Sequence, residues 1–278
     1  MNEKTIVYQP TSMSEVQTLL KNNQNISALA GCTEFLLGQH ELNFTLPKYL
    51  ISLSGLKDLH EVNKTERYLN LGAMVSLNKI LNLGERNIPT ILFMSLKTIS
   101  SINLRNLSTI GGNLAITKKL KTLYAVMMAL DVRIEIKTGT ETLWLPFSKY
   151  VSDDFAEIRN KPYIITSIRI YDENWTYSFF KRVGKKGIID YETAYFIFLI
   201  KLQKNLITDV RVCFSAKSFF RSREFENSIL GMTLPFSKKD ILQILDNAKK
   251  FFPDEVFIHG FHKQIFFNLL LKCFVDLN

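Results

Sequence analysis

Alternating strand and helix patterns at the start of the chain constrain its fold more than any other feature. Residues 4–8, 26–30 and 48–53 are short runs of strand-forming residues. Between the first two runs, Ser12 and Glu15 have the spacing of a capping box, and an apolar stripe of helical period follows. A second short helix is expected before the third run. Strands separated by helices pair in parallel through right-handed crossovers, so the pattern predicts a small parallel α/β unit.

Antiparallel patterns follow this unit. The runs 133–137 and 142–146 flank Thr138-Gly139-Thr140, which predicts a hairpin. A break near 172–175 predicts two domains, 1–172 (with parts 1–55 and 56–172) and 173–278, in an α+β fold. We expect further strands at 59–62, 68–72, 164–171, 176–183, 192–203 and 207–215, helices at 76–83, 89–99, 120–130, 221–230, 237–250 and 258–275, and a turn-rich segment at 103–117.

The composition excludes several classes of protein. Hydrophobic residues make up 46% and charged residues 22% of the 278 residues, which is the balance of an ordinary globular protein. The longest apolar run, 194–200, is far shorter than the roughly 18 residues that span a bilayer. With no signal-type segment at the start, we expect a cytoplasmic protein that binds no membrane. The net charge of +9 is spread along the chain, so no nucleic-acid binding is expected.

The chain offers no recognisable metal centre or catalytic set of its own. Cys32, Cys213 and Cys273 are too few for an iron–sulfur cluster, which needs about four thiolates. The pair His259 and His262 has no further ligand nearby in sequence, so helical packing is the simpler interpretation. The pair Asp153-Asp154 is expected to lie in a turn. We therefore predict no metal ligand and no catalytic acid or base.

Two glycine turns are the segments that suggest chemistry. In residues 28–36 a buried strand leads directly into Gly31 and a helix start, where backbone amides and the helix dipole favour a phosphate. In residues 105–115 the pair Gly111-Gly112 is flanked by Thr109 and Asn113. Each turn alone is more often structural. Together, two such turns are able to hold one extended phosphate ligand between them.

The second turn, Arg105-Asn106-Leu107-Ser108-Thr109-Ile110-Gly111-Gly112-Asn113, resembles the R-N-x-x-T-I-G-G-N motif of the FAD-binding subunits of molybdenum hydroxylases. The first resembles their A-G-G-T-[DNS]-L loop. Further similarities cover the whole chain: Gly72-Ala73-Met74, Ala129-Leu130-Asp131, Phe180-Lys181 with Lys186, and the last helix from Phe261 to Leu269.

The resemblance implies an oxidoreductase subunit. Its fold would be a PCMH-type FAD-binding fold, a small α/β unit plus a larger α+β unit, followed by a C-terminal domain of antiparallel sheet and helices. It would pass electrons from the [2Fe–2S] clusters of a small partner subunit through FAD to NAD⁺ or another acceptor. A large subunit with the molybdenum cofactor would feed the clusters.

The resemblance also implies the residues that hold FAD. The first loop would bind the pyrophosphate, the second loop would hold the other side of the cofactor, and a lysine of the C-terminal domain would reach the flavin. The residues are Leu29, Ala30, Gly31, Cys32, Thr33, Glu34, Ala73, Ser108, Thr109, Gly111, Gly112, Asn113 and Lys181.

Two departures from the family pattern leave an alternative open. Cys32 replaces the second glycine of the first loop, where a side chain can block a phosphate or forbid a positive φ. After Asn113, Lys118-Lys119 replace Ser-Pro, and Thr122 replaces an acid that lies near the cofactor in the family. The alternative is a scaffold or assembly subunit that has lost FAD. A third possibility is a flavoenzyme of the vanillyl-alcohol-oxidase type that acts alone. The C-terminal third of the sequence disfavours it, because this part resembles the molybdenum hydroxylase flavoprotein domain and not a substrate-binding cap.

Overall fold

A computed structural model describes residues 4–33, 46–115, 122–185, 190, 192–216 and 219–278. The chain divides into two compact units. The first contains Met1–Ile88, Ser100–Lys119 and Leu130–Asp172, and the second contains Pro89–Ile99, Leu120–Ala129 and Glu173–Asn278. Two helices from the middle of the sequence therefore belong to the same compact unit as the C-terminal third. The domain boundaries expected from the sequence stay a prediction.

The first unit begins with the parallel sheet that the alternating pattern predicts. Strands β1 (Ile6–Tyr8) and β2 (Ile26–Leu29) both pair in parallel with β3 (Tyr49–Ser52), in the order β1-β3-β2. Helix α1 (Met13–Asn22) begins at Ser12, whose hydroxyl accepts from the Glu15 amide at 3.3 Å. The Glu15 carboxylate accepts from the Thr11 amide, one residue earlier than a capping box requires. Val16 and Leu20 bury the apolar stripe of α1 against Ile26 and Ile51 of the sheet.

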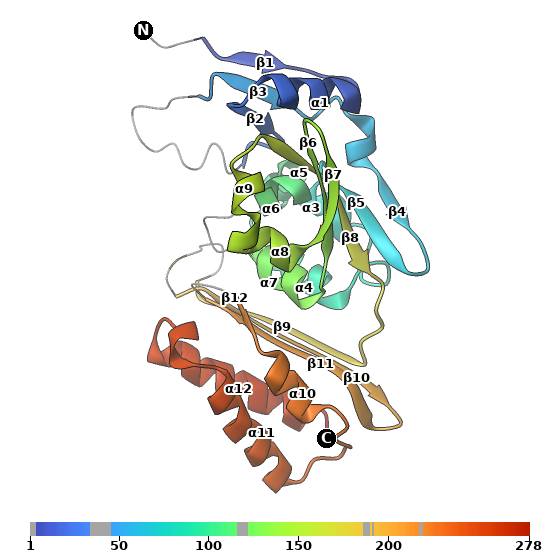
Figure 1. The fold of residues 1–278 in the computed structure, drawn as a ribbon. Coiled ribbons are helices and arrows are strands. Elements are labelled where there is room, and N and C mark those ends of the chain that lie inside the picture. The colour runs from blue at the N-terminus through green and yellow to red at the C-terminus, as the bar shows by residue number, and fades with distance from the viewer. Residues whose placement is uncertain (1–3, 34–45, 116–121, 186–189, 191, 217–218) are drawn as a thin grey trace. The chain divides into compact units, whose positions relative to one another are not determined.

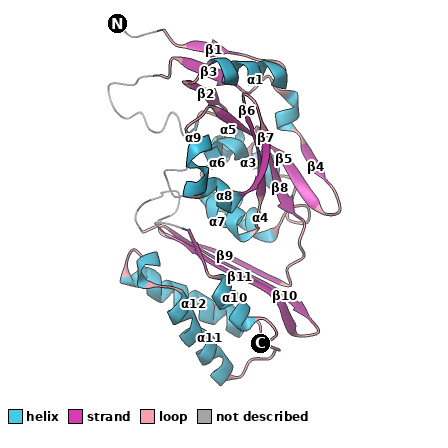
Figure 2. Cartoon of the chain, in the orientation of Figure 1, coloured by secondary structure: helices cyan, strands magenta, loops and turns pink. Residues whose placement is uncertain are grey.

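A five-stranded antiparallel sheet forms the rest of the first unit. Its order is β4-β5-β8-β6-β7, so the hairpin β6–β7 is joined to the sheet through β8. Isoleucine and leucine alternate with polar residues along these strands, which buries one face of the sheet beneath short helices (Figure 2). The strands are β4 (Val62–Lys64), β5 (Tyr68–Gly72), β6 (Arg133–Thr138), β7 (Thr142–Pro146) and β8 (Tyr163–Tyr171), and the helices are η1 (Lys57–His60), α3 (Leu77–Leu81), α5 (Ile102–Leu107), α6 (Ile110–Ala115), α8 (Phe147–Val151), η2 (Asp153–Phe155) and α9 (Ala156–Arg159).

The second unit is an antiparallel sheet with helices on both faces. Its strands are β9 (Tyr177–Val183), β10 (Ala194–Gln203), β11 (Leu206–Ser215) and β12 (Phe219–Arg221), in the order β12-β11-β10-β9. Helices α4 (Thr90–Thr98) and α7 (Thr122–Ala129) pack on one face. The other face carries α10 (Arg223–Ile229), α11 (Lys238–Phe251), the short η3 (Asp254–Val256) and α12 (Gly260–Asp276), drawn in orange and red in Figure 1.

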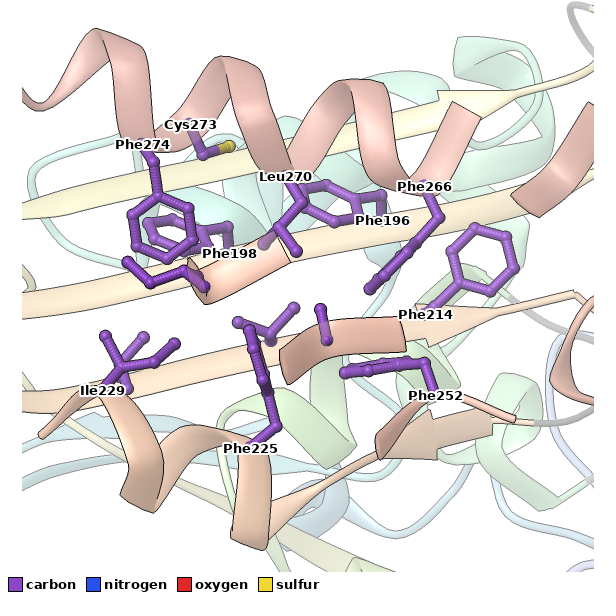
Figure 3. Packing of buried hydrophobic residues seen from close by; sticks show 14 of the residues in the cluster. Phe196, Phe198, Phe214, Phe225, Ile229, Phe252, Phe266, Leu270, Cys273 and Phe274 are labelled. Carbon is purple, nitrogen blue, oxygen red and sulfur yellow. The ribbon is translucent and has the colours of Figure 1, made fainter. Parts of the chain in front are cut away.

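Phenylalanine fills the core between this sheet and its C-terminal helices. Phe196 and Phe198 project from β10 towards Phe266 and Phe274 of α12, with ring centroids 5.7 and 5.3 Å apart (Figure 3). Tyr195, which precedes Phe196 in β10, is also fully buried, and its hydroxyl accepts from Thr122 of α7 at 2.8 Å. Burial on both faces explains why 194–200 is a continuous apolar run without alternation.

The structure corrects the expected elements at several places. The described part of the segment expected to be turn-rich, 103–115, is largely helical, because α5 and α6 occupy it with a tight turn at Ser108 and Thr109 between them. The strand expected at 59–62 begins only at Val62, because η1 occupies Lys57–His60. Strand β12 and the helices α8 and α9 were not expected. Each is three to five residues long, too short to show a period. The helix expected after Gly31 lies mostly outside the described residues.

Candidate functional site

The first glycine loop leaves the parallel sheet at the end of β2. The Leu29 carbonyl accepts from the Leu53 amide at 3.0 Å, which is the last bond of the strand to β3. Ala30, Gly31 and Cys32 then form a turn that leads to Thr33, the last described residue of this segment. The strand followed by a glycine turn is the order that the sequence predicts, and the helix expected next lies outside the described residues.

Gly31 lies directly against the turn that follows α5. A Cβ atom added to Gly31 would lie 1.8 Å from the Leu107 carbonyl oxygen, so no side chain fits there. Beside this contact, the hydroxyl oxygens of Thr33 and Ser108 are 2.9 Å apart and share a hydrogen bond. The two glycine loops are therefore in direct contact. The Leu107 carbonyl is part of this contact, and nothing in the sequence marked it.

Three backbone hydrogen bonds hold the second loop against the segment that follows β5. The Ser108 carbonyl accepts from Leu77, Ile110 donates to the Val75 carbonyl and Gly111 donates to the Ala73 carbonyl, at 2.9, 3.0 and 2.9 Å. The 5% exposed Thr109 caps α6, because its hydroxyl accepts from the Gly112 amide at 3.1 Å.

Both glycines of the pair allow a close approach between backbone segments. A Cβ on Gly111 would lie 2.5 Å from the Ala73 Cβ, so Ala73 is packed beneath the second loop. A Cβ on Gly112 would lie 2.9 Å from the Thr109 hydroxyl and 3.4 Å from the Ala30 Cβ. Residues from three separate segments, at 29–33, 73 and 108–113, thus form one cluster.

Cys32 adopts the left-handed conformation that makes glycine favourable at this position. Its φ is 57°, one of the few positive values at non-glycine residues in the described chain. Its thiol is half-buried and contacts the Ala30 carbonyl oxygen at 3.5 Å. Within the described residues, the backbone amides of Cys32 and Thr33 have no hydrogen-bond acceptor. The loop therefore keeps two donors available although a side chain replaces the glycine.

Asn113 adds an unused acceptor to the cluster. Its amide donates to the Thr109 carbonyl at 2.9 Å, but its side-chain Oδ1 is buried and has no hydrogen-bond partner in the described chain. A buried acceptor without a partner is destabilising by about 1–3 kcal/mol. A ligand donor is the simplest way to satisfy it. Free amides, glycines without side chains and a buried amide oxygen fit a pyrophosphate-containing cofactor.

The structure does not place every predicted site residue in this cluster. Glu34 and the pair Lys118-Lys119 lie outside the described residues. Lys181 is an exposed residue of β9 and belongs to the second unit. Thr122, at the position of the family's acid, also belongs to the second unit, where its hydroxyl bonds to Tyr195 in a buried position.

A family model described as the FAD binding domain in molybdopterin dehydrogenase matches residues 2–170. The chain belongs to this family. The predicted family, fold class, oxidoreductase class and FAD cofactor are thereby confirmed. Within the described residues, no helix is both long and apolar enough to cross a membrane.

Individual relatives agree with this assignment. The chain is 24% identical to the glyceraldehyde dehydrogenase medium chain of Sulfolobus acidocaldarius over 80% of each chain. It is 23% identical to the nicotinate dehydrogenase FAD-subunit of Eubacterium barkeri, over 55% of this chain and 52% of that one. Among solved structures, quinoline 2-oxidoreductase from Pseudomonas putida 86 superposes with a TM-score of 0.80 at 17% identity, over 99% of this chain and 97% of that one.

Proposed function

We propose that this chain is the FAD-binding, electron-transfer subunit of a molybdenum hydroxylase-type complex. The observation that carries the proposal is the contact between the two glycine loops, with Gly31 against Leu107 and Thr33 bonded to Ser108. The two turns lie 75 residues apart in sequence and meet where two backbone amides and one side-chain amide oxygen have no hydrogen-bond partner among the described residues. Membership of the FAD-binding family supports the same conclusion.

The residues of the first unit have defined tasks in this proposal. When bound, FAD supplies a redox centre that takes up and releases electrons. The amides of Cys32 and Thr33 would donate to the pyrophosphate, and Asn113 Oδ1 would accept from the cofactor. Gly31, Gly111 and Gly112 have no side chains that would separate the two loops. Ala73 packs directly against Gly111 of the second loop. Lys181, which the family resemblance assigns to the flavin region, belongs to the second unit, and its role stays a prediction.

The proposal also includes the partner subunits and the path of the electrons. The medium chain and FAD-subunit relatives are named as parts of larger enzymes. We therefore expect a [2Fe–2S] small subunit as electron donor and a large molybdenum-cofactor subunit that oxidises the substrate. NAD⁺ is one acceptor to test. Cys32, Cys213 and Cys273 are fewer than the about four thiolates that a cluster needs, so we expect the partner subunit to hold the clusters.

Absorption spectroscopy tests the proposal directly. The purified chain, incubated with FAD and desalted, should show flavin bands at close to one FAD per chain, and dithionite should bleach them. The variant G31A should lose the bands, because its methyl group would collide with the Leu107 carbonyl. G260A is the matched control, since nothing lies within 4 Å of a Cβ at Gly260.

The alternative is a scaffold subunit without FAD, suggested by Cys32 and Thr122. It predicts a colourless wild-type chain that FAD neither colours nor stabilises against heat, but that still assembles with the other subunits. That result would overturn the electron-transfer proposal. Flavin bands in the wild type that persist in G31A would instead show that FAD binds elsewhere on the chain.

A further inference from the structure

Helix α12 is apolar on more than the side that faces the sheet. Figure 3 shows Phe266 and Phe274 pointing from α12 into the core of the second unit. Phe261, Leu271 and Val275 of the same helix are instead 38%, 39% and 53% exposed. A surface helix normally buries one apolar stripe and presents polar residues to solvent. Grouped exposed apolar residues therefore make the outer side of α12 a candidate binding surface.

The outer residues of α12 form one continuous face. Residues three and four positions apart lie next to each other on an α-helix, and the residues between Phe261 and Val275 on the side away from the core follow these spacings. Each of them is exposed or half-buried. We call this set the α12 face, and its members are Phe261, Gln264, Ile265, Asn268, Leu271, Lys272 and Val275.

The apolar residues of the α12 face are arranged symmetrically around Asn268. Phe261 and Val275 lie seven residues before and after it, and Ile265 and Leu271 lie three residues before and after it. Two identical helices that pack antiparallel across a twofold axis bring together residues at equal distances from that axis. With the axis at Asn268, Phe261 would pack against Val275 of a second copy, and Ile265 against its Leu271. Every apolar residue of the face would then have an apolar partner.

The polar residues of the face follow the same symmetry. Asn268 would lie on the axis, where its side-chain amide both donates and accepts, so the two copies would satisfy each other. Gln264 and Lys272 lie four residues before and after Asn268, so the Gln264 side-chain oxygen would accept from Lys272 of the second copy. A polar residue within a helix–helix contact fixes the register of the pair. This pattern selects an identical helix as the partner over any other apolar surface.

The charges of α12 do not oppose such pairing. Its charged residues are Lys263, Lys272 and Asp276, and each has a counter-charge within the chain. Lys263 is paired with Asp254 at 2.6 Å, and Lys272 with Asp276 at 2.7 Å. Two copies would therefore meet without an uncompensated like charge. Antiparallel helices also place the positive end of one helix dipole beside the negative end of the other.

From this symmetry we infer that the α12 face binds the same face of a second copy of this chain, with the two helices antiparallel around a twofold axis at Asn268. The helix has 17 residues and is about 25 Å long. One helix from each copy gives an interface at the small end of known sizes, below about 1,200 Å², so the dimer should be reversible. The inference is independent of the proposed function, because α12 contains no residue of the two glycine loops.

Sedimentation velocity of the purified full chain tests the association. At about 100 μM we expect a species of twice the 32.1 kDa chain mass, which dissociates to the monomer near about 1 μM. V275E places a carboxylate without a partner in the helix contact and should weaken the dimer at least about tenfold. I102E is the matched control, because Ile102 is 56% exposed and lies on α5 of the other unit. It should dimerise within about twofold of the wild type.

Cysteine cross-linking tests the register and does not depend on the folding of V275E. Asn268 of one copy would meet Asn268 of the other at the axis, so N268C should form an intermolecular disulfide when copper–phenanthroline is the oxidant. Gln264 of the two copies would lie about 12 Å apart along the helices, which is too far for a disulfide. Q264C, at an equally exposed position, should therefore not cross-link. The wild type, with its three native cysteines, gives the background.

Each result decides the inference. A wild-type chain that stays monomeric at the higher concentration, a folded V275E that dimerises like the wild type, or a Q264C that cross-links as fast as N268C would overturn it. A monomeric wild type whose V275E variant no longer binds the iron–sulfur or the molybdenum subunit would assign the α12 face to that subunit and would also overturn the dimer. The flavin absorption of the same samples tests the proposed function separately.

Discussion

The conformation of Cys32 gives the first prediction at the scale of single residues. A left-handed φ is unfavourable for any residue with a Cβ, so C32G should relieve strain in the first loop. We expect the free energy of unfolding to rise by about 0.5–1 kcal/mol, measured by urea denaturation. C32A is the control, because it removes the thiol and keeps the Cβ. If C32A stabilises the chain as much as C32G, the thiol rather than the backbone is the cause.

The three thiols should differ in reactivity. Cys213 and Cys273 are fully buried, so both should be inaccessible to a reagent, and burial raises the pKa of Cys273 to about 12, so its thiol should also stay protonated. Cys32 is half-buried in the first loop. A thiol reagent should therefore label one cysteine in the folded chain and three in urea, as read by mass spectrometry. Bound FAD should slow the labelling of Cys32. Rapid labelling of Cys213 or Cys273 under native conditions would contradict this packing.

At the scale of elements, a buried ion pair joins α10 to the edge of the second sheet. Glu226 of α10 is 3% exposed and accepts from Arg221 Nε at 2.6 Å, Arg221 Nη2 at 2.9 Å and the Val212 amide at 3.0 Å. E226A removes all three bonds and leaves the buried Val212 amide without its acceptor. We expect a loss of about 3–5 kcal/mol in the free energy of unfolding.

An exposed ion pair in the same unit provides the control for this prediction. Lys249 and Asp246 of α11 are 2.8 Å apart, with side chains 61% and 67% exposed. K249A should change the stability by less than about 0.5 kcal/mol. If both variants lose the same small amount in urea denaturation, the Glu226 pair does not hold α10 to the sheet.

Elements with a clear period were predictable, and short ones were not. The alternation in β6 and the stripe of α1 each span enough residues to show which face is buried. Segment 103–117 was expected to be turn-rich because its glycines favour turns. In the structure Gly111 and Gly112 lie within α6, where the close approach of Ala73 and Thr109 requires them to lack side chains. These two glycines are therefore needed for close packing and not for a turn. A local sequence pattern does not distinguish these two reasons for a glycine.

At the scale of the whole molecule, buried tyrosine and cysteine side chains predict that the folded chain loses stability at alkaline pH. Burial raises the pKa of Tyr195, against the opposing hydrogen bond from Thr122, and also raises the pKa of Cys273. Above about pH 9 these groups lose protons in the unfolded chain while the folded chain keeps them. The folded state then binds more protons, so the free energy of unfolding falls as the pH rises.

Urea denaturation between about pH 8 and about pH 10.5 measures this slope. Y195F should make the decline shallower, because one group that titrates on unfolding is removed. A stability that stays constant or rises over this range, or a Y195F slope equal to that of the wild type, would show that these buried groups do not govern the alkaline limit.

The sequence by itself determined the parallel start of the chain, most strands and helices, the two glycine turns and the resemblance to the FAD-binding family. These features depend on residues close together in the chain. Only the tertiary structure decided that Gly31 lies against Leu107, that Cys32 has a positive φ and that Val275 stays exposed on α12. Thr33 and Ser108 are 75 residues apart, so their hydrogen bond depends on the path of the intervening backbone. Local patterns do not encode that path, because it is set by how whole elements pack.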